Sequence, residues 1–231
     1  MPKYGYMKKS LFAKIISVVF GRPTQLWAYF RQTYLFFQTY YLRKIFINNK
    51  SQYHIEKNVR IQALKTLIAE PDAKIFLGKN SVVYENARLE VFGTGELSVG
   101  ENSIIGDARI SCRNKISIGK NFLTSWNVFI QDFDSHPVNP EERAAQVDSM
   151  SLNFFPAFQE KPATIIFHFD FPSEEINIGN NVWLGANVSI LKGAQIGDNT
   201  IVATGAVVLK GQYAANSILA GNPAKVVKTF V

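Results

Sequence analysis

A six-residue repeat between residues 178 and 210 is the feature that most constrains this chain. A large aliphatic residue stands at every sixth position there, namely Ile178, Leu184, Ile190, Ile196, Val202 and Val208. A period of six matches neither the 3.6-residue turn of a helix nor the two-residue alternation of a strand. It predicts a solenoid whose short strands meet at corners, with the aliphatic residue inside each corner. A Gly or Asn beside it is expected to adopt the unusual backbone angles of the turn.

The full pattern, aliphatic–small–x–x–small–x, resembles that of the hexapeptide-repeat acyltransferases, which include maltose, galactoside and polysaccharide O-acetyltransferases. The ending from Ala220 to Lys228, AGNPAKVVK, is similar to the closing segment of that family. The resemblance implies a mainly β fold, a left-handed parallel β-helix in which three hexapeptides form one triangular coil. An unrelated repeat of Gly-bounded strands is the alternative interpretation.

Residues 1–50 differ in charge from the rest of the chain. They hold nine Lys or Arg and no Asp or Glu, although the whole chain has a net charge of only +7. The 25 basic residues less these nine leave 16 after residue 50, against 18 acidic ones. The high pI therefore belongs to an arm, and this argues against a nucleic-acid-binding protein.

This arm is predicted to form two helices, roughly residues 8–20 and 24–46, separated by Gly21-Arg22-Pro23. In the second helix, aromatic residues recur on one face: Trp27, Phe30, Tyr34, Phe37 and Tyr41. A basic, aromatic segment without acids is typical of a peripheral anchor on an anionic membrane leaflet. Packing of the aromatic face on the solenoid or on a neighbouring subunit is the competing interpretation.

Residues 51–231 are predicted to form the β-helix domain, with a loop insertion at about 131–176. The repeat is looser between residues 53 and 129, where extra residues at 93–95 and 112–114 suggest small corner loops. The insertion has no repeat of its own and contains many Phe residues, so we expect it to pack and to be functional. In the resembling family, a loop at this point reaches the adjoining subunit.

His136 is the predicted catalytic residue. The segment His136-Pro137-Val138-Asn139-Pro140-Glu141-Glu142-Arg143 resembles the family's active-site segment, in which the His is the general base. A neutral imidazole can take the proton of an acceptor hydroxyl as that hydroxyl attacks a thioester. Asp134 is the first candidate to orient the ring, with Glu142 and Asp132 as alternatives. His54 has no motif around it. His168 lies in an apolar Phe-rich run and is interpreted as structural, with entry into a neighbouring site as the alternative.

Resemblance to the family also implies acetyl-CoA as the acyl donor, held along a groove between two subunits. The matching donor-binding positions are Trp183, Ala186, Thr204, Gly205, Lys210, Lys225 and Lys228. The two terminal lysines would meet the nucleotide phosphates as point charges, and the backbone N–H of Ala186 is a candidate for the thioester oxyanion. Leu209-Lys210-Gly211 stands where the family often has Thr-Lys-Asp, so no contact is assigned to Leu209.

Together these features predict an acetyl-CoA-dependent O-acetyltransferase that modifies a sugar hydroxyl, with a surface polysaccharide, capsule or lipopolysaccharide intermediate as acceptor. An N-acyltransferase acting on an amino-sugar nucleotide is the alternative within the class. A zinc hydratase is disfavoured because the three His residues lack paired ligand spacing, and no metal site is predicted. A non-catalytic β-helix scaffold would leave the His136 segment unexplained.

The predicted partners are the saccharide acceptor and two further copies of the chain, because the family forms homotrimers with sites between subunits. No apolar run approaches the roughly 20 residues of a spanning helix. The single Cys112 cannot form an internal disulfide and is interpreted as a core residue. We therefore expect a cytoplasmic protein, with peripheral contact at the inner face of the membrane if the arm binds lipid.

Overall fold

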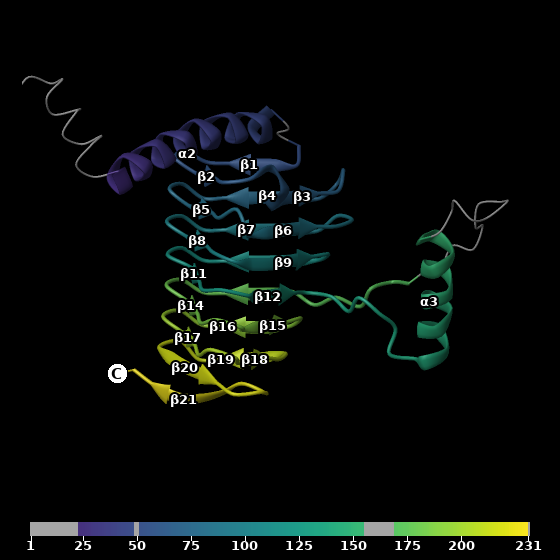
Figure 1. The fold of residues 1–231 in the computed structure, drawn as a ribbon. Coiled ribbons are helices and arrows are strands. Elements are labelled where there is room, and N and C mark those ends of the chain that lie inside the picture. Colours follow the sequence, from purple (N-terminus) through teal and green to yellow (C-terminus); the bar gives the residue numbers. More distant parts are fainter. Residues whose placement is uncertain (1–22, 49–50, 155–168, 231) are drawn as a thin grey trace, which may run out of the picture.

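The computed structural model describes residues 23–48, 51–154 and 169–230, and its dominant feature is a parallel β-helix of about seven coils (Figure 1). Three parallel sheets form its walls, and the chain passes through one strand of each sheet in every coil. The first sheet contains β1 (Tyr53–Ile55), β4 (Lys74–Leu77), β7 (Glu96–Val99), β10 (Lys115–Ile118), β13 (Ile176–Ile178), β16 (Ala194–Ile196) and β19 (Gly211–Tyr213). The predicted β-helix is confirmed.

The second and third sheets complete the triangular section. The second contains β2 (Arg60–Ile61), β5 (Val82–Val83), β8 (Ile104–Ile105), β11 (Leu123–Thr124), β14 (Trp183–Leu184), β17 (Ile201–Val202), β20 (Ser217–Ala220) and β21 (Lys225–Thr229). The third contains β3 (Leu67–Ala69), β6 (Arg88–Val91), β9 (Ala108–Cys112), β12 (Val128–Gln131), β15 (Ser189–Leu191) and β18 (Val207–Val208). The β21 strand pairs antiparallel with β20 and closes the C-terminal end.

The repeat builds the core as predicted. The six aliphatic residues from Ile178 to Val208 are all buried, and they belong to one hydrophobic cluster that extends through the solenoid. Their sixfold spacing places each of them on a successive wall, pointing inward. Earlier coils follow the same rule, since Leu77, Val83 and Leu89 are also buried at this spacing.

The turn chemistry differs from the prediction in one respect. Asn, not Gly, adopts the left-handed conformation at the corner between the first and second sheets, with φ between 55° and 61° at Asn58, Asn80, Asn102, Asn121, Asn181, Asn199 and Asn216. Several of these side chains hydrogen-bond to one another along the stack, such as Asn80 to Asn102 at 3.1 Å. The glycine at this corner instead allows adjacent coils to approach closely. A Cβ on Gly100 would lie 2.5 Å from the backbone carbonyl carbon of Gly119. The prediction that a Gly or Asn takes the unusual angles is therefore confirmed for Asn and wrong for the glycine at this corner, where adjacent coils leave no room for a side chain.

Two helices and one short 3-10 turn, η1 (Leu64–Thr66), complete the described residues. Helix α2 (Pro23–Asn48) confirms the second predicted helix and lies across the N-terminal end of the solenoid (Figure 1). Helix α3 (Pro140–Phe154) belongs to the insertion and projects away from the solenoid (Figure 1). The helix predicted at residues 8–20 lies outside the described residues. In the described part of the chain, no helix is long and apolar enough to cross a membrane.

Candidate active site

The insertion leaves the solenoid through an antiparallel stem. After β12 the chain runs outward, and it returns beside itself before β13, with Phe133 and Ser173 forming an antiparallel bridge. The backbone N–H of Asp134 donates to the carbonyl of Pro172 at 2.9 Å, and that of Glu174 donates to the carbonyl of Asp132 at 2.8 Å. The stem therefore determines the position, relative to the solenoid, from which the segment after Asp134 continues.

Asp132 anchors the base of this stem. Its fully buried carboxylate accepts hydrogen bonds from the backbone N–H groups of Arg113 (2.8 Å) and Asn114 (3.0 Å) and from the thiol of Cys112 (3.3 Å). Burial raises the pKa of the Asp132 carboxyl above its usual value. Burial, together with the nearby charge of Asp132, also raises the pKa of the Cys112 thiol far above its usual value. The thiol stays protonated and donates to Asp132, so Cys112 is a structural residue.

Aromatic residues and one arginine hold the two arms of the stem together. The guanidinium carbon of Arg113 lies 3.7 Å from the ring centre of Phe171 and 5.3 Å from that of Phe133. Phe169 and Phe171 are in edge contact at 5.0 Å. A cation over an aromatic face is attracted by the ring quadrupole. The expectation that the insertion packs is thus confirmed for Phe169 and Phe171, whereas the side chains of Phe154, Phe155, Phe158, Phe167 and His168 lie outside those described.

The residues of the His136 motif shape the start of α3. The Asn139 side-chain oxygen accepts from the backbone N–H groups of Glu141 (2.8 Å) and Glu142 (3.1 Å), which is an N-cap. Pro140 begins the helix, where its missing N–H costs nothing, and the two glutamates favour the positive end of the helix dipole. Arg143 donates to the carbonyls of Pro137 and Val138, both at 2.9 Å, and folds the segment back over the helix.

This folding brings His136 against Gln146. The Nδ1 atom of His136 lies 2.8 Å from Oε1 of Gln146, a buried side chain on α3. An amide oxygen can only accept, so the proton of the neutral ring is on Nδ1. The amide is itself oriented by a hydrogen bond from its Nε2 to the carbonyl of Ser135 at 3.4 Å. His136 is an exposed residue, and its Nε2 is consequently the ring atom that carries the free lone pair.

Asp134 occupies a different position from the one expected. Its carboxylate pairs with Nζ of Lys192 at 2.6 Å, across from the stem to the end of β15. The residue that meets Nδ1 of His136 is Gln146, and not Asp134, Glu142 or Asp132. Sequence reasoning missed Gln146 because it looked for a carboxylate close in the chain, whereas α3 returns a residue ten positions later. Its position fewer than two helical turns after the Pro140 that begins the helix was the available signal.

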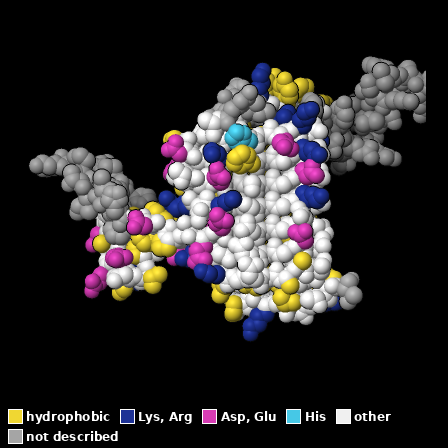
Figure 2. All heavy atoms as spheres, turned by 180° about the vertical axis from the view of Figure 1, so that it is seen from behind, with side chains coloured by type: hydrophobic (Ala, Val, Ile, Leu, Met, Phe, Trp, Pro, Cys, Tyr) yellow, Lys and Arg dark blue, Asp and Glu magenta, His cyan; other side chains and the backbone are white. Residues whose placement is uncertain are grey.

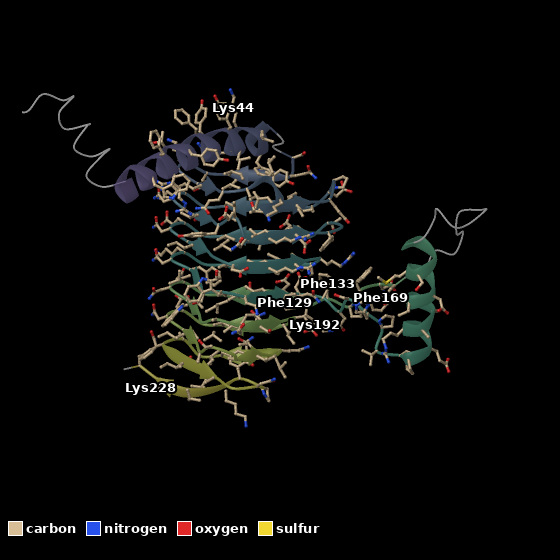
Figure 3. The ribbon with its side chains drawn as sticks, in the orientation of Figure 1. Lys44, Phe129, Phe133, Phe169, Lys192 and Lys228 are labelled. Carbon is tan, nitrogen blue, oxygen red and sulfur yellow. The ribbon has the colours of Figure 1, made fainter. Side chains whose placement is uncertain are left out.

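A groove of about 670 Å³ joins this segment to the third sheet. Its lining comes from β12, from the stem and from the residues at the ends of β15 and β18: Phe129, Gln131, Phe133, Asp134, Ser135, His136, Val138, Leu191, Lys192, Leu209 and Lys210. Figure 3 shows Phe129, Phe133 and Lys192 gathered where the stem leaves the solenoid. A cavity of this size with one imidazole and two lysines suits a polar ligand bound beside an apolar wall.

Of the predicted donor-binding residues, Lys210 shares this groove with His136. Its Nζ is paired with Glu174 at 2.6 Å. Ala186 and Gly205 lie at the opposite ends of the same strands, in the turns that precede β15 and β18, where the N–H of Gly205 donates to the carbonyl of Ala186 at 2.9 Å. Thr204 is in the same turn as Gly205, whose φ of +75° is a conformation that glycine adopts most readily.

The remaining predicted residues lie on the second sheet. Trp183 on β14 is exposed, and its indole N–H donates to Oγ of Ser125 at 3.3 Å. Lys225 and Lys228 are exposed on β21. Figure 3 shows Lys228 at the C-terminal end of the solenoid. Within a single chain, His136 therefore lies apart from the turn residues Ala186, Thr204 and Gly205 and from the two terminal lysines. Among the described residues, no group of three His, Cys, Asp or Glu side chains could hold a metal ion.

Comparison with known proteins agrees with this architecture. Residues 175–210 match the family model described as bacterial transferase hexapeptide (six repeats). The chain is 29% identical to a protein named as the lipopolysaccharide biosynthesis O-acetyl transferase WbbJ of Escherichia coli K12, over 69% of this chain and 74% of that protein. It is 32% identical to the galactoside O-acetyltransferase of the same organism, over 60% of this chain and 64% of that protein. The chain is therefore similar to the hexapeptide-repeat acyltransferases, whose repeat it carries between residues 175 and 210.

A solved structure supports the fold of this acyltransferase. The N-acyltransferase AntD from Bacillus cereus, solved as a mutant with dTDP and coenzyme A, aligns with a TM-score of 0.55 and 15% identity. The alignment covers 78% of this chain and 86% of that chain. At this level of identity the likeness concerns the fold alone.

Proposed function

We propose that this acyltransferase transfers an acetyl group from acetyl-CoA to a hydroxyl of a saccharide, with His136 as general base. The observation that carries the proposal is the hydrogen bond from Nδ1 of His136 to Gln146, because it leaves the lone pair of Nε2 available in a groove. An imidazole held in this tautomer can accept the proton of an attacking hydroxyl. The named activities of the two Escherichia coli relatives, both O-acetyltransferases, support the same choice.

The proposed reaction is a balanced acyl transfer. The acceptor oxygen forms a bond to the thioester carbonyl carbon while its proton passes to Nε2 of His136. Collapse of the tetrahedral intermediate breaks the carbon–sulfur bond, and the imidazolium returns the proton to the departing sulfur. A backbone N–H at the turn before β15, that of Ala186, is proposed to stabilise the negative oxygen of the intermediate.

A homotrimer is part of the proposal, because it would complete the site. Within one chain, His136 lies beyond the ends of the strands of the third sheet, and Ala186 and Gly205 precede their beginnings. In a closed ring of three flat-walled prisms, the groove of one chain can face the turn residues of the next. Trp183, Thr204 and Lys210 are then proposed to border the pantetheine arm, with Lys225 and Lys228 near the nucleotide phosphates.

The acceptor is proposed to be a surface polysaccharide, capsule or lipopolysaccharide intermediate assembled at the inner face of the membrane. The name of the first relative, a lipopolysaccharide biosynthesis enzyme, points to this class. The basic segment of residues 1–50 supports a peripheral membrane location, since anionic leaflets attract Lys and Arg. Transfer to the amine of an amino-sugar nucleotide is the second candidate, favoured by the fold-level likeness to AntD.

A coupled assay tests the proposal and separates the two acceptors. Purified protein is incubated with acetyl-CoA and a panel of neutral sugars, amino sugars and amino-sugar nucleotides, and free thiol is followed with time. We expect acceptor-dependent thiol release and a product whose acetyl group is lost in mild base, since esters hydrolyse there and amides do not. A base-stable product would favour N-acylation. Thiol release that no acceptor of the panel increases would contradict the proposal.

A further inference from the structure

Helix α2 uses one side to close the solenoid. Leu42 and Phe46 are buried against the first coil, where the ring of Phe46 lies 4.9 Å from that of Tyr53. On the same side, Arg43 donates from Nη2 to the carbonyl of Glu56 at 3.0 Å. The helix covers the end of β1 and β2, which would otherwise present an uncovered coil to solvent.

The opposite side of α2 carries an exposed aromatic stripe, which we define as Trp27, Phe30, Tyr34, Phe37 and Tyr41. Each residue of the stripe is between 55% and 71% exposed. These are the residues whose spacing predicts one helix face, and the solenoid does not cover that face. Contiguous exposed aromatic surface of this kind marks an interaction site, because single exposed apolar residues are common but clusters are not.

Two cations accompany the stripe. Arg31 lies one helical turn after Trp27, and Lys44 lies two turns after Phe37, so both border the aromatic face. Lys44 points away from the solenoid (Figure 3), and hydrophobic and basic side chains share this end of the molecule when it is seen from behind (Figure 2). The first fifty residues contain no Asp or Glu that would repel an anionic surface.

We infer that the outer face of α2 binds the surface of a bilayer that contains anionic lipids, with the helix axis parallel to the membrane. Aromatic rings at the headgroup level and flanking Lys or Arg are the chemistry of interfacial helices. Because α2 lies across the end of the solenoid, this contact directs the coils away from the membrane (Figure 1). In the proposed homotrimer, three stripes would lie on one side and bind with avidity.

This orientation defines the substrate that the groove can reach, and this part of the inference rests on the proposed function. In the third sheet, β12 follows β3, β6 and β9 in order. Three strand spacings of ~4.8 Å plus a helix ~10 Å thick place the groove on the order of 25 Å from the bilayer surface. The acceptor hydroxyl should therefore belong to a sugar held several residues above a lipid carrier, and not to the sugar nearest the membrane.

Vesicle co-sedimentation of the full-length protein tests the inference. One vesicle population contains phosphatidylcholine with phosphatidylglycerol, and the other contains phosphatidylcholine alone. We expect binding to the anionic vesicles that weakens as salt is added. The triple variant Trp27→Ser, Tyr34→Ser, Tyr41→Ser should lower the partition coefficient by roughly tenfold or more.

Tyr84→Ser is the matched control, because Tyr84 is an exposed aromatic residue on the wall of the solenoid. It should leave vesicle binding unchanged. Equal binding by the triple variant and the unmodified protein would overturn the inference. So would absence of binding to the anionic vesicles. A triple variant that changes the oligomeric state while vesicle binding persists would assign the stripe to another copy of the chain.

The proposed acetyl transfer and the proposed membrane contact can each be refuted without refuting the other. Thiol release with a soluble acceptor should be the same for the triple variant and the unmodified protein, since α2 is remote from the groove. If vesicle binding is found and no acceptor releases thiol, the proposed function fails and the membrane contact stands. If acetyl transfer is found without vesicle binding, the membrane contact fails alone.

Discussion

The coils are built from repeated contacts, whereas the insertion that interrupts them is built from contacts that occur once. In the coils, inward residues stack on equivalent residues of the neighbouring strands, as with Ile75, Leu97 and Ile116 on the first wall. In the insertion, the contacts of His136, Gln146 and Asp134 each occur once. The comparison shows that stability is distributed over repeated positions, whereas the chemistry depends on a few unrepeated contacts.

Loss of His136 should have the largest effect and should leave the coils intact. His136→Ala removes the proposed base, so we expect the rate of acetyl transfer to fall by about 10²–10⁴-fold. Because this change replaces none of the donor-binding residues proposed above, the dissociation constant for CoA should change little. Initial rates and equilibrium CoA binding measure the two quantities. A variant that retains full activity would remove His136 from the mechanism.

A core substitution in the coils should instead lower the stability of the protein and preserve its acetyl-transfer activity. Leu97→Ala deletes a fully buried side chain on β7, remote from the groove, and should lower the free energy of unfolding by about 2–5 kcal/mol. Denaturant titration measures the loss, and acetyl-transfer rates at low temperature should be preserved. Ser98→Ala, at the outward-facing neighbour, is the control and should change stability far less. Equal losses from both substitutions would contradict the assignment of Leu97 to the core.

Replacement of Gln146 should have the smallest effect and is the sharpest test of the site. Gln146→Ala removes the acceptor for Nδ1 of His136, and we expect the rate to fall by roughly tenfold. Gln146→Glu places a carboxylate there, which favours the imidazolium, so the acid limb of the pH–rate profile should move to higher pH.

Asp134→Asn is the matched control for this experiment, because the Asp134 carboxylate pairs with Lys192. It should leave the acid limb where it is. If Asp134→Asn moves the limb as far as Gln146→Glu does, the orienting role returns to Asp134, as the sequence suggested.

The coils could be predicted from the sequence because their period is local. Each hexapeptide contains its own inward residue and its own corner, so the buried positions from Ile178 to Val208 follow from counting. The error about the corner glycine arose at the contact between coils, which no single hexapeptide contains. Cβ contacts at Gly100 depend on the backbone of the next coil.

The site was predictable only in part. The motif around His136 pointed to a segment that lines the groove, and the N-cap at Asn139 follows from local helix chemistry. The sequence did not predict the hydrogen-bond partner of the imidazole, because that partner depends on how α3 folds back. Similarly, the aromatic face of α2 could be predicted, but whether the solenoid covered it could not.

The sequence by itself determined the β-helix, the inward residues and the segment that bears the imidazole, since each depends on residues a few positions apart. Only the tertiary structure decided that Gln146 holds His136, that Asp134 pairs with Lys192 and that the aromatic face of α2 points away from the coils. The physical reason is that periodicity encodes short-range geometry. Hydrogen bonds and exposure depend instead on which distant segments the folded chain brings together.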